Sequence, residues 1–222
     1  MKRKKKEDKK ESKKVEKKDN QLYWIFGVML IILAGAIVYP FILNAINTFE
    51  YQGLEFRKEK FDQIDVYRYS YFFNDYSGQM YEYNLYLRND PRENNVSIEG
   101  EINYPSGKYV YIGINGTGLV QCPTILRDAG TLALFLKDNL SPANIAVKSG
   151  ITDENEAKAL NISYVSCERR PENTVIIIQK DDETKIEKEN NCHAISVASC
   201  DDLTRAIEKF EVQSIIDAKE RS

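Results

Sequence analysis

The chain has 222 residues and an almost balanced charge, with 31 Lys and Arg against 34 Asp and Glu. Residues 1–19 contain eleven basic and five acidic residues, a net charge of +6, which leaves 20 basic and 29 acidic residues, a net charge of −9, for the remainder. This asymmetry excludes a uniformly soluble globule. With only four Cys and one His, the chain also has few thiol or imidazole groups that could serve as metal ligands or in a thiol enzyme.

Residues 1–20 are rich in lysine and predict a basic, disordered cytoplasmic tail. A lysine run beside a membrane gains ~1 kcal/mol per basic residue near an anionic surface, so contact with anionic lipid is the alternative to a purely topogenic tail. Acidic residues between the lysines weaken that contact, and no aromatic residue is present to stack on bases. We therefore expect no nucleic-acid partner.

Residues 21–45 predict one membrane-spanning helix. The 22 residues from Leu22 to Leu43 carry no charge, and about 20 apolar helical residues span the hydrocarbon core of a bilayer. A helix also satisfies its own backbone hydrogen bonds in lipid. Aromatic residues that suit the two membrane interfaces stand at the ends of the run: Tyr23, Trp24, Tyr39 and Phe41.

The flanks of this helix predict its orientation. The segment before it is strongly basic, whereas the charges that follow it nearly cancel. The positive-inside rule therefore places the N-terminus in the cytoplasm and residues 46–222 outside the cell membrane. The run is longer than the roughly 7–15 apolar residues of a signal peptide, and the small residues Ala34 to Ala36 lie in its middle, so we expect an uncleaved signal anchor.

Residues 49–114 alternate in polarity with period two and predict a β-rich first half of the outer domain. The expected strands are 49–56, 66–71, 81–87, 96–104 and 109–114, of which the second and third form a hairpin. The tyrosines on one face of this hairpin are interpreted as a half-buried sheet face with hydroxyl groups at its rim. The functional alternative is an aromatic platform for carbohydrate or peptide.

After Cys122 the apolar spacing approaches 3.6 residues, which predicts an α/β second half over 115–222. The expected helices are 123–140, 153–160 and a last one that Asp201 or Asp202 caps, with a bend near Val212 as an alternative to a straight course. The expected strands are 144–148, 162–165, 174–179, 184–188 and 193–199. The last helix carries one apolar stripe and should pack on the sheet. The predicted fold class is α+β: one transmembrane helix, then an extracytoplasmic domain with a β-rich first half and an α/β second half.

All four cysteines follow the apolar run, as expected of disulfides in an oxidising compartment. Cys192 and Cys200 flank one strand, so their Cα atoms stand ~26 Å apart, whereas a disulfide needs less than about 7 Å. If the last three strands form a meander, the first and third run in the same direction. The third strand then starts, at Cys192, near Cys167. Cys200 follows the opposite end of that strand, which leaves Cys122 as the partner of Cys200. The expected disulfides are Cys167–Cys192 and Cys122–Cys200.

The alternative use of the cysteines is a metal site with His193. No C-x-x-C pair occurs and the spacing matches no zinc pattern, so we expect neither metal nor cofactor, and His193 is interpreted as structural. The segment from Gly113 to Gly118 stands where a phosphate loop would, but it lacks the required Lys-Ser/Thr and glycine order, so it is interpreted as a turn. No nucleophile elbow is present, which makes an enzyme the less favoured class.

Four Asn-x-Ser/Thr sequons follow the apolar run, and the expected compartment permits their glycosylation. Asn115 is the favoured acceptor because it lies in a Gly-rich loop. Asn95 and Asn161 are further candidates, whereas Pro142 beside the sequon of Asn139 argues against that one.

Three segments carry a family resemblance: Tyr83–Arg92, Asn191–Cys200 and Lys209–Asp217. They resemble segments of uncharacterised single-span membrane proteins of small-genome archaea, and the likeness covers the chain from about Phe49 onward. The resemblance implies a cell membrane that faces the outside directly, with N-glycans, and brings no activity or site residue. The overall plan also resembles a type IV pilin, but the junction before Leu22 lacks the small residue of a prepilin cleavage site.

The sequence thus predicts a membrane-anchored, disulfide-stabilised module that acts outside the cytoplasm by binding or by contributing to an envelope assembly. Its expected partners are the lipid bilayer and a protein or glycan at the cell surface. Two alternatives stay open. An acidic or His-containing cleft would favour a cell-surface enzyme such as a hydrolase, and cleavage before Leu22 would favour a pilin-like filament subunit.

Overall fold

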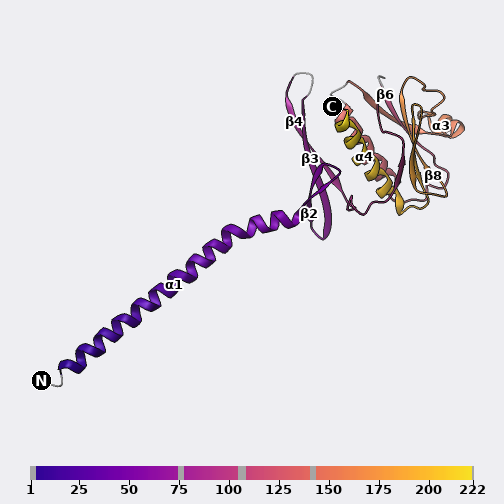
Figure 1. Ribbon diagram of the computed structural model, residues 1–222. Coiled ribbons are helices and arrows are strands. Elements are labelled where there is room, and N and C mark those ends of the chain that lie inside the picture. The colour runs from indigo at the N-terminus through magenta and orange to yellow at the C-terminus, as the bar shows by residue number, and fades with distance from the viewer. Residues whose placement is uncertain (1–3, 75–77, 105–108, 141–143, 222) are drawn as a thin grey trace. The chain divides into compact units, whose positions relative to one another are not determined.

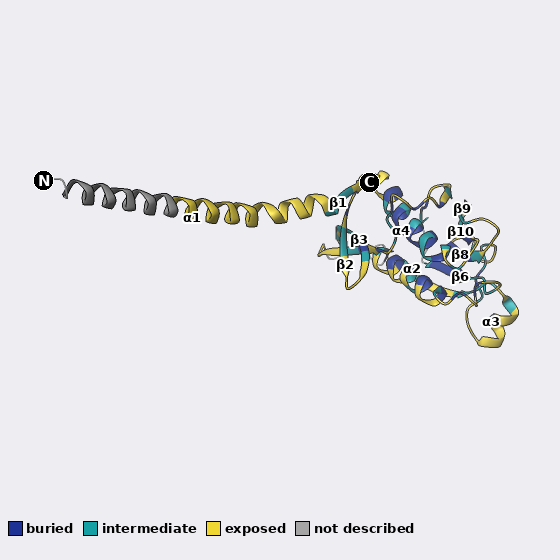
Figure 2. Ribbon diagram, turned by 90° about the horizontal axis from the view of Figure 1, so that it is seen from below, coloured by how far each residue is buried: buried dark blue, intermediate teal, exposed yellow. Residues whose placement is uncertain are grey.

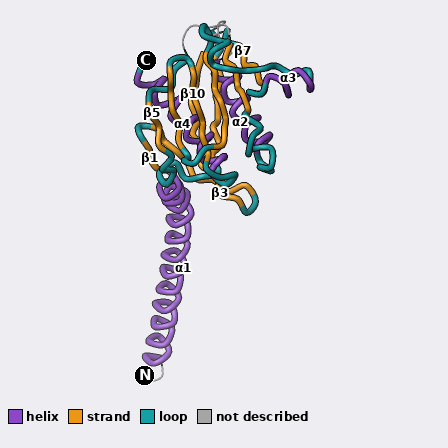
Figure 3. The backbone as a smooth tube through the Cα atoms, turned by 90° about the vertical axis from the view of Figure 1, so that its right-hand side faces the viewer, coloured by secondary structure: helices purple, strands orange, loops and turns teal. Residues whose placement is uncertain are grey.

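The computed structural model describes residues 4–74, 78–104, 109–140 and 144–221 of the chain. The chain divides into two units, residues 1–48 and residues 49–222. The first unit consists of one helix, α1 (Lys4–Asn47). The second unit, called the head domain below, is an α+β structure, as Figure 3 shows.

The part of α1 from Tyr23 to Asn47 is long and apolar enough to cross a membrane, with a mean hydropathy of 2.5 over this stretch. Its side chains are exposed almost throughout (Figure 2). A helix of 25 residues with this composition is stable in lipid, where its backbone groups bond one another and its apolar side chains meet acyl chains. These properties make α1 a candidate membrane anchor. A signal sequence near an N-terminus has the same properties.

Residues 4–20, which were expected to be disordered, form the first turns of α1. Lys and Glu both have high helix propensity, and neither Gly nor Pro occurs before Gly27. Acidic residues also stand three positions before lysines, as Glu7 does before Lys10, a spacing that favours the helical conformation. High propensity without a breaker therefore extends the helix through the basic segment.

The head domain begins with a four-stranded sheet in the order β1-β2-β3-β4. Its strands are β1 (Thr48–Tyr51), β2 (Leu54–Phe61), β3 (Ile64–Asn74) and β4 (Met80–Leu87). β3 pairs antiparallel with both β2 and β4, and Tyr71 lies opposite Tyr83. The hairpin expected from the alternating tyrosines is therefore present.

The single strand expected over 49–56 is instead two strands joined by a tight turn. Gln52 and Gly53 both have positive φ, 49° and 75°, as the two central residues of a type I′ turn require. The turn reverses the chain directly after Tyr51. Because apolar and polar residues alternate on both sides of it, the sequence pattern does not reveal the reversal.

The second sheet has six strands in the order β5-β9-β10-β8-β6-β7. They are β5 (Ser97–Glu99), β6 (Tyr109–Ile114), β7 (Ala146–Ile151), β8 (Thr174–Lys180), β9 (Lys185–Glu189) and β10 (Cys192–Val197). β10, β8, β6 and β7 run parallel, and β9 runs antiparallel to β10. β5 and β6, which were expected with the β-rich first half, thus belong to the second sheet.

The order of the last three strands differs from the expected meander. β10 lies between β8 and β9, and pairs with both. β10 buries His193, Ile195 and Val197, whereas β9 is mostly charged, and an inner strand of a covered sheet favours apolar residues. β8 and β10 still run in the same direction, which is the feature on which the disulfide pairing depends.

Two expected strands are shorter than predicted. Of residues 96–104 only Ser97–Glu99 is a strand, and Gly100, with a φ of 92°, follows its end. Of residues 162–165 only Tyr164 pairs, through one isolated bridge. In both segments the apolar pattern reflects burial of loop residues more than pairing.

Helices α2 (Ile125–Leu140) and α4 (Asp202–Glu220) lie between the two sheets, and the short α3 (Glu154–Leu160) lies at one side (Figure 1). α2 and α4 contact each other and also contact β7 and β10 of the second sheet. On the other side, Phe135 of α2 packs on Tyr83 of β4, with 6.2 Å between ring centroids. One core therefore extends from the first sheet through the helices to the second; examples are Leu87, Leu132, Phe210 and Ile176.

α4 is buried on two sides because a sheet lies on each. It runs without interruption from Asp202 to Glu220, so the bend near Val212 is absent. Besides its apolar stripe it buries three acidic residues, Glu208, Glu211 and Asp217. A single stripe packed on one sheet, as the sequence suggested, therefore describes only half of its environment.

Candidate functional site: an aromatic cleft in the head domain

Aromatic rings line the inner face of the first sheet. Successive inward residues of β3 stack along the strand, with 5.5 Å between the ring centroids of Tyr69 and Tyr71. Cross-strand pairs join them to β4: Tyr71 lies 5.4 Å from Tyr83, and Phe73 lies 6.0 Å from Tyr81. Cross-strand aromatic pairs stabilise a sheet and hold the rings in fixed orientations.

This row of rings is buried at one end and open at the other. Phe56 is fully buried and lies 5.5 Å from Tyr69, whereas Tyr81, at the far end of the row, is 43% exposed. Toward the open end, the rings face a cleft of about 540 Å³ between β3 and the C-terminal halves of α2 and α4. Its main apolar walls are Tyr69, Tyr71, Phe73, Phe135, Leu136 and Ile215.

A few polar groups stand among these rings. The hydroxyl of Tyr71 donates a hydrogen bond to the side-chain oxygen of Asn139, whose amide in turn donates to the Phe135 carbonyl at 2.7 Å. The hydroxyl groups of Tyr104 and Ser214 lie 2.8 Å apart and share a hydrogen bond. Hydrogen-bonding groups therefore occupy defined positions on mostly apolar walls.

The tyrosine hydroxyls of the cleft are neutral at physiological pH. Burial raises the pKa of Tyr69, Tyr71 and Tyr104 above the ordinary value of 10. Neutral hydroxyl groups both donate and accept hydrogen bonds. The arrangement can therefore hold a ligand through ring faces and hydroxyl contacts, and none of these tyrosines supplies a charge or a general base.

Comparison with known protein families, curated proteins and solved structures finds no match. The resemblance to archaeal single-span proteins therefore stays a prediction. Function is inferred here from the geometry of the head domain alone.

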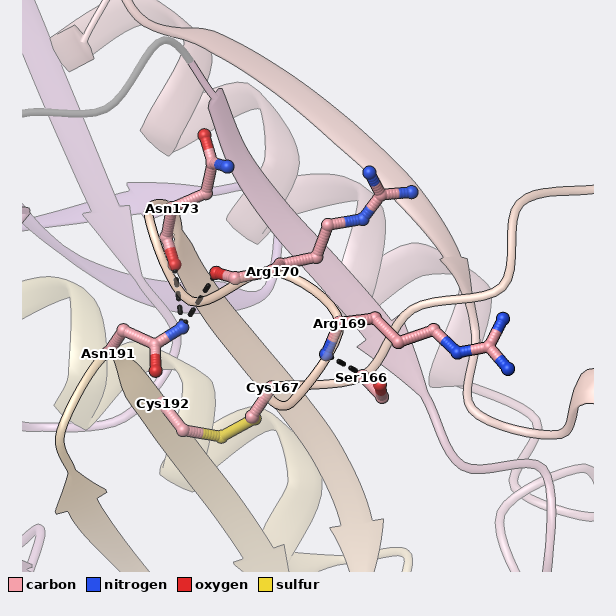
Figure 4. The surroundings of a disulfide bond; sticks show 7 residues. All are labelled: Ser166, Cys167, Arg169, Arg170, Asn173, Asn191 and Cys192. Carbon is pink, nitrogen blue, oxygen red and sulfur yellow. Dashed lines mark hydrogen bonds between the residues drawn. A yellow bond between two sulfur atoms is a disulfide. The ribbon is translucent and has the colours of Figure 1, made fainter.

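The structure contains both expected disulfides. Cys122, just before α2, is bonded to Cys200, just before α4, with 5.3 Å between the Cα atoms. Cys167 is bonded to Cys192 at the start of β10. Figure 4 shows the second bond beside Asn191, whose side-chain amide donates to the main-chain carbonyls of two residues of the adjacent loop, at 2.9 Å in each case. Both bonds lie outside the cleft and stabilise the fold around it, and disulfides are typical of an oxidising compartment.

The sequons lie in different environments. Asn95 and Asn161 are exposed, and Asn161 is the residue that ends α3 in the left-handed conformation. Asn115 is half-buried, and its side-chain oxygen accepts a hydrogen bond from the main-chain N–H of Thr117 at 3.1 Å. The amide of Asn139 is bonded within α2 and faces the cleft.

His193 is not part of the cleft. It is buried between β10 and α4, where its Nε2 atom lies 3.2 Å from the Asn103 carbonyl and its ring meets Phe210 edge-on. Burial lowers the pKa of His193 to about 4, so the ring is neutral in the folded protein at physiological pH. In the described part of the chain no group of three or more His, Cys, Asp or Glu is placed to hold a metal ion.

Sequence reasoning identified the aromatic face of the hairpin but missed the walls opposite it. The sequence marks Asn139 only as part of a sequon, and no motif in it marks Ser214 as a site residue. Both lie in the C-terminal halves of helices, and only the tertiary packing of those helices brings them beside Tyr71 and Tyr104. No local pattern in the sequence could have paired them.

Proposed function

We propose that the protein is a membrane-anchored binding module whose head domain holds a glycan in the aromatic cleft, outside the cytoplasm. The observation that supports this most directly is the cleft itself. Its volume of about 540 Å³ lies within the roughly 300–1,000 Å³ typical of ligand sites, which combine apolar walls with a few placed polar groups. A sugar ring has an apolar C–H face that can lie on an aromatic ring and hydroxyl groups at its edge. The ring faces of Tyr71 and Phe73 and the polar groups of Asn139 and Ser214 match these two features.

A hydrolase is not favoured at this site. Ser214 and Lys219 line the cleft, but the Ser214 hydroxyl is bonded to Tyr104 and the Lys219 ammonium to the Gly53 carbonyl. The described lining residues include no carboxylate, histidine or cysteine to serve as acid, base or thiol nucleophile. Binding without chemistry is the simpler use of such walls. The envelope-assembly role enters the same proposal, because a glycan held by an anchored domain links the membrane to the cell surface.

The proposed ligand is tested with full-length protein in detergent and a panel of cell-envelope oligosaccharides, with binding measured by saturation-transfer NMR. We expect Phe73→Ala to weaken binding by about tenfold or more, because one buried aromatic contact is typically worth more than about 1 kcal/mol. Phe61→Ala is the matched control, since Phe61 is 58% exposed on the same sheet and outside the cleft; its affinity should stay unchanged. Binding of peptides but of no saccharide, or equal affinities for Phe73→Ala and wild type, would contradict the proposal.

The proposed orientation keeps the N-terminus in the cytoplasm and α1 uncleaved in the membrane. The basic segment before the apolar run supports it through the positive-inside rule, and the two disulfides support an oxidising side for the head domain. In that compartment Asn95, Asn115 and Asn161 are the proposed N-glycan acceptors.

Protease added to intact cells is expected to digest the head domain and to leave a short fragment that contains α1. Detection with one antibody to the tail and one to the head domain distinguishes the two parts. A head domain that survives in intact cells but is digested after lysis would show the opposite orientation. A mature protein that begins at or after Leu22 would show cleavage and would favour the signal-peptide or filament alternative.

A further inference from the structure

A second, smaller cavity lies away from the aromatic cleft. It has a volume of about 170 Å³ and is formed by the N-terminal halves of α2 and α4 and the end of β4. Three carboxyl groups line it, those of Asp128, Glu208 and Glu211. Tyr86 and Arg88 are exposed, so they form part of its mouth.

Two of the three carboxylates already have their partners. Asp128 accepts hydrogen bonds from Arg127 Nε at 2.7 Å and from the Thr204 hydroxyl at 2.9 Å. Glu208 accepts from the main-chain N–H of Arg88 at 2.5 Å, and from the main-chain and side-chain N–H groups of Asn89 at 3.1 and 2.7 Å. These bonds fix the positions of both groups. In Glu208 they oppose the effect of burial, which still raises the pKa of this carboxyl above its ordinary value.

Glu211 is different, because it has no partner among the described residues. It is only 4% exposed, and its buried Oε1 atom makes no hydrogen bond. Several buried side-chain atoms of the described residues lack a partner, and Glu211 is the one among them whose residue lines this cavity. Such a group calls for a physical explanation, and a bound polar molecule or ion is one of them. Glu211 therefore lines the cavity as an acid with an unsatisfied oxygen, whereas the other two acids have hydrogen-bond partners.

The charges that act on Glu211 are negative. Burial raises the pKa of Glu211 well above its ordinary value, and the carboxylates of Glu208 and Asp128 raise it further. Arg127 at the rim is paired with Asp128. The other ionisable side chains around Glu211 are Arg88 and Tyr86, which are exposed at the mouth of the cavity, and the tyrosines Tyr83 and Tyr104. The pKa values of these two tyrosines are raised, so both are neutral.

Arg127 is paired with Asp128, and Arg88 is exposed at the mouth of the cavity. The acid of this cavity that lacks a partner among the described residues is Glu211. A cavity of this size with such a carboxyl fits an organic cation better than a metal ion. The described acids do not converge closely enough to form a metal-binding group of three. A cation that carries several N–H donors can instead reach carboxylates that stand further apart. A volume of about 170 Å³ is of the order of the 150 Å³ cavity that admits benzene, so it accommodates a short alkylammonium or a guanidinium group.

We propose that this cavity binds a primary ammonium or guanidinium group, with Glu211 as the carboxylate that accepts its N–H bonds. When the cation enters, Glu211 releases its proton to the solvent, so that one positive charge replaces another in the cavity. The site is separate from the aromatic cleft and does not depend on what that cleft holds. The cation belongs either to a free amine or to a lysine or arginine side chain of a partner protein.

The test uses full-length protein in detergent, titrated with n-butylammonium, methylguanidinium and a short peptide with a central lysine, with heat and proton release followed by calorimetry. We expect binding with release of about one proton, and an affinity that rises about tenfold per pH unit while free Glu211 is protonated. Tetramethylammonium, which has the charge but no N–H donor, should bind about tenfold more weakly or not at all. Tighter binding of the peptide than of butylammonium would assign the cation to a partner protein, and the reverse order would assign it to a free amine.

Glu211→Gln retains the shape and the neutral state of the protonated acid, so it should fold normally. We expect it to bind the cations at least about tenfold more weakly and without pH dependence. Glu220→Gln is the control, because Glu220 is an exposed acid on the same helix; its affinity should match wild type. The proposal is overturned if Glu211→Gln binds as wild type does, if tetramethylammonium binds equally well, or if no N–H cation binds.

Discussion

A double Cys122→Ala, Cys200→Ala variant is expected to lose about 4 kcal/mol of the free energy of unfolding of the head domain. The two residues are 78 positions apart, so the bond closes a long loop in the unfolded chain and removes much of its conformational entropy. In the folded state the bond joins the residue before α2 to the residues before α4. These are the two helices that fill the space between the sheets, so both sheets depend on their placement.

Urea unfolding of full-length protein in detergent, followed by the near-ultraviolet circular dichroism of the tyrosines, measures this loss. The matched control is Cys167→Ala, Cys192→Ala, which opens a loop of 25 residues and is expected to lose about 3 kcal/mol. A reducing agent should bring wild type below either variant. An unchanged urea midpoint for the Cys122 and Cys200 variant would contradict the expectation. Four thiols that react with an alkylating agent without prior reduction would contradict the disulfides themselves, and with them the oxidising compartment.

The pairing of the cysteines was predictable because it depends on strand direction, not on strand order. Cys192 and Cys200 stand at opposite ends of β10, whichever strands lie beside it. A strand that runs parallel to β8 must begin near the residue that precedes β8, which places Cys192 beside Cys167. The order itself was not predictable, because the placement of β10 between β8 and β9 depends on which strand has both faces covered in the assembled sheet.

The environment of α4 was only half predictable for a related reason. Its apolar residues recur at helical spacing, which indicates one buried face. The second buried face contains Glu208 and Glu211, and Asp217 is buried on the apolar side of the helix; acidic residues on a helix normally indicate a solvated surface. Asp217 is buried because it accepts a hydrogen bond from the main-chain N–H of Ile102 at 2.6 Å, a contact across 115 positions of the chain that no local pattern encodes.

The two cavities follow from the same architecture. When a pair of helices lies between two sheets, side chains must fill the gaps between helices and sheets toward both ends of the pair. A cavity is left wherever the side chains are too short to fill such a gap. Toward the C-terminal ends of α2 and α4, the aromatic rings of β3 leave the open cleft. Toward the N-terminal half of α2, the carboxylates and the end of β4 leave the smaller polar cavity. In most of a fold, buried polar groups have hydrogen-bond partners. Groups that lack a partner are exceptions to this rule, and such exceptions are concentrated at functional sites.

Replacing Glu211 by methionine is expected to stabilise the head domain by about 1–3 kcal/mol at pH 8, because it removes a buried polar group that has no partner. Methionine has a similar length and no charge, and its flexible side chain fits irregular space. The acid cavity would thus lose its hydrogen-bonding group while the fold gained stability. A residue that weakens the fold in this way is typical of a site shaped by binding.

The size of this stabilisation is expected to depend on pH with a definite sign. Burial, together with the carboxylates of Glu208 and Asp128, raises the pKa of Glu211 well above its ordinary value of 4.5. Above pH 4.5 the folded state therefore keeps a proton that the unfolded state releases, and the contribution of Glu211 to the free energy of unfolding falls as pH rises toward the folded-state pKa. Urea unfolding of wild type and Glu211→Met at pH 4, 6 and 8 should show a difference that is smallest at pH 4 and largest at pH 8. Glu211→Gln, which also cannot ionise, should follow the pH profile of the methionine variant, whereas the same difference at all three pH values would mean that Glu211 ionises alike in the folded and unfolded chain.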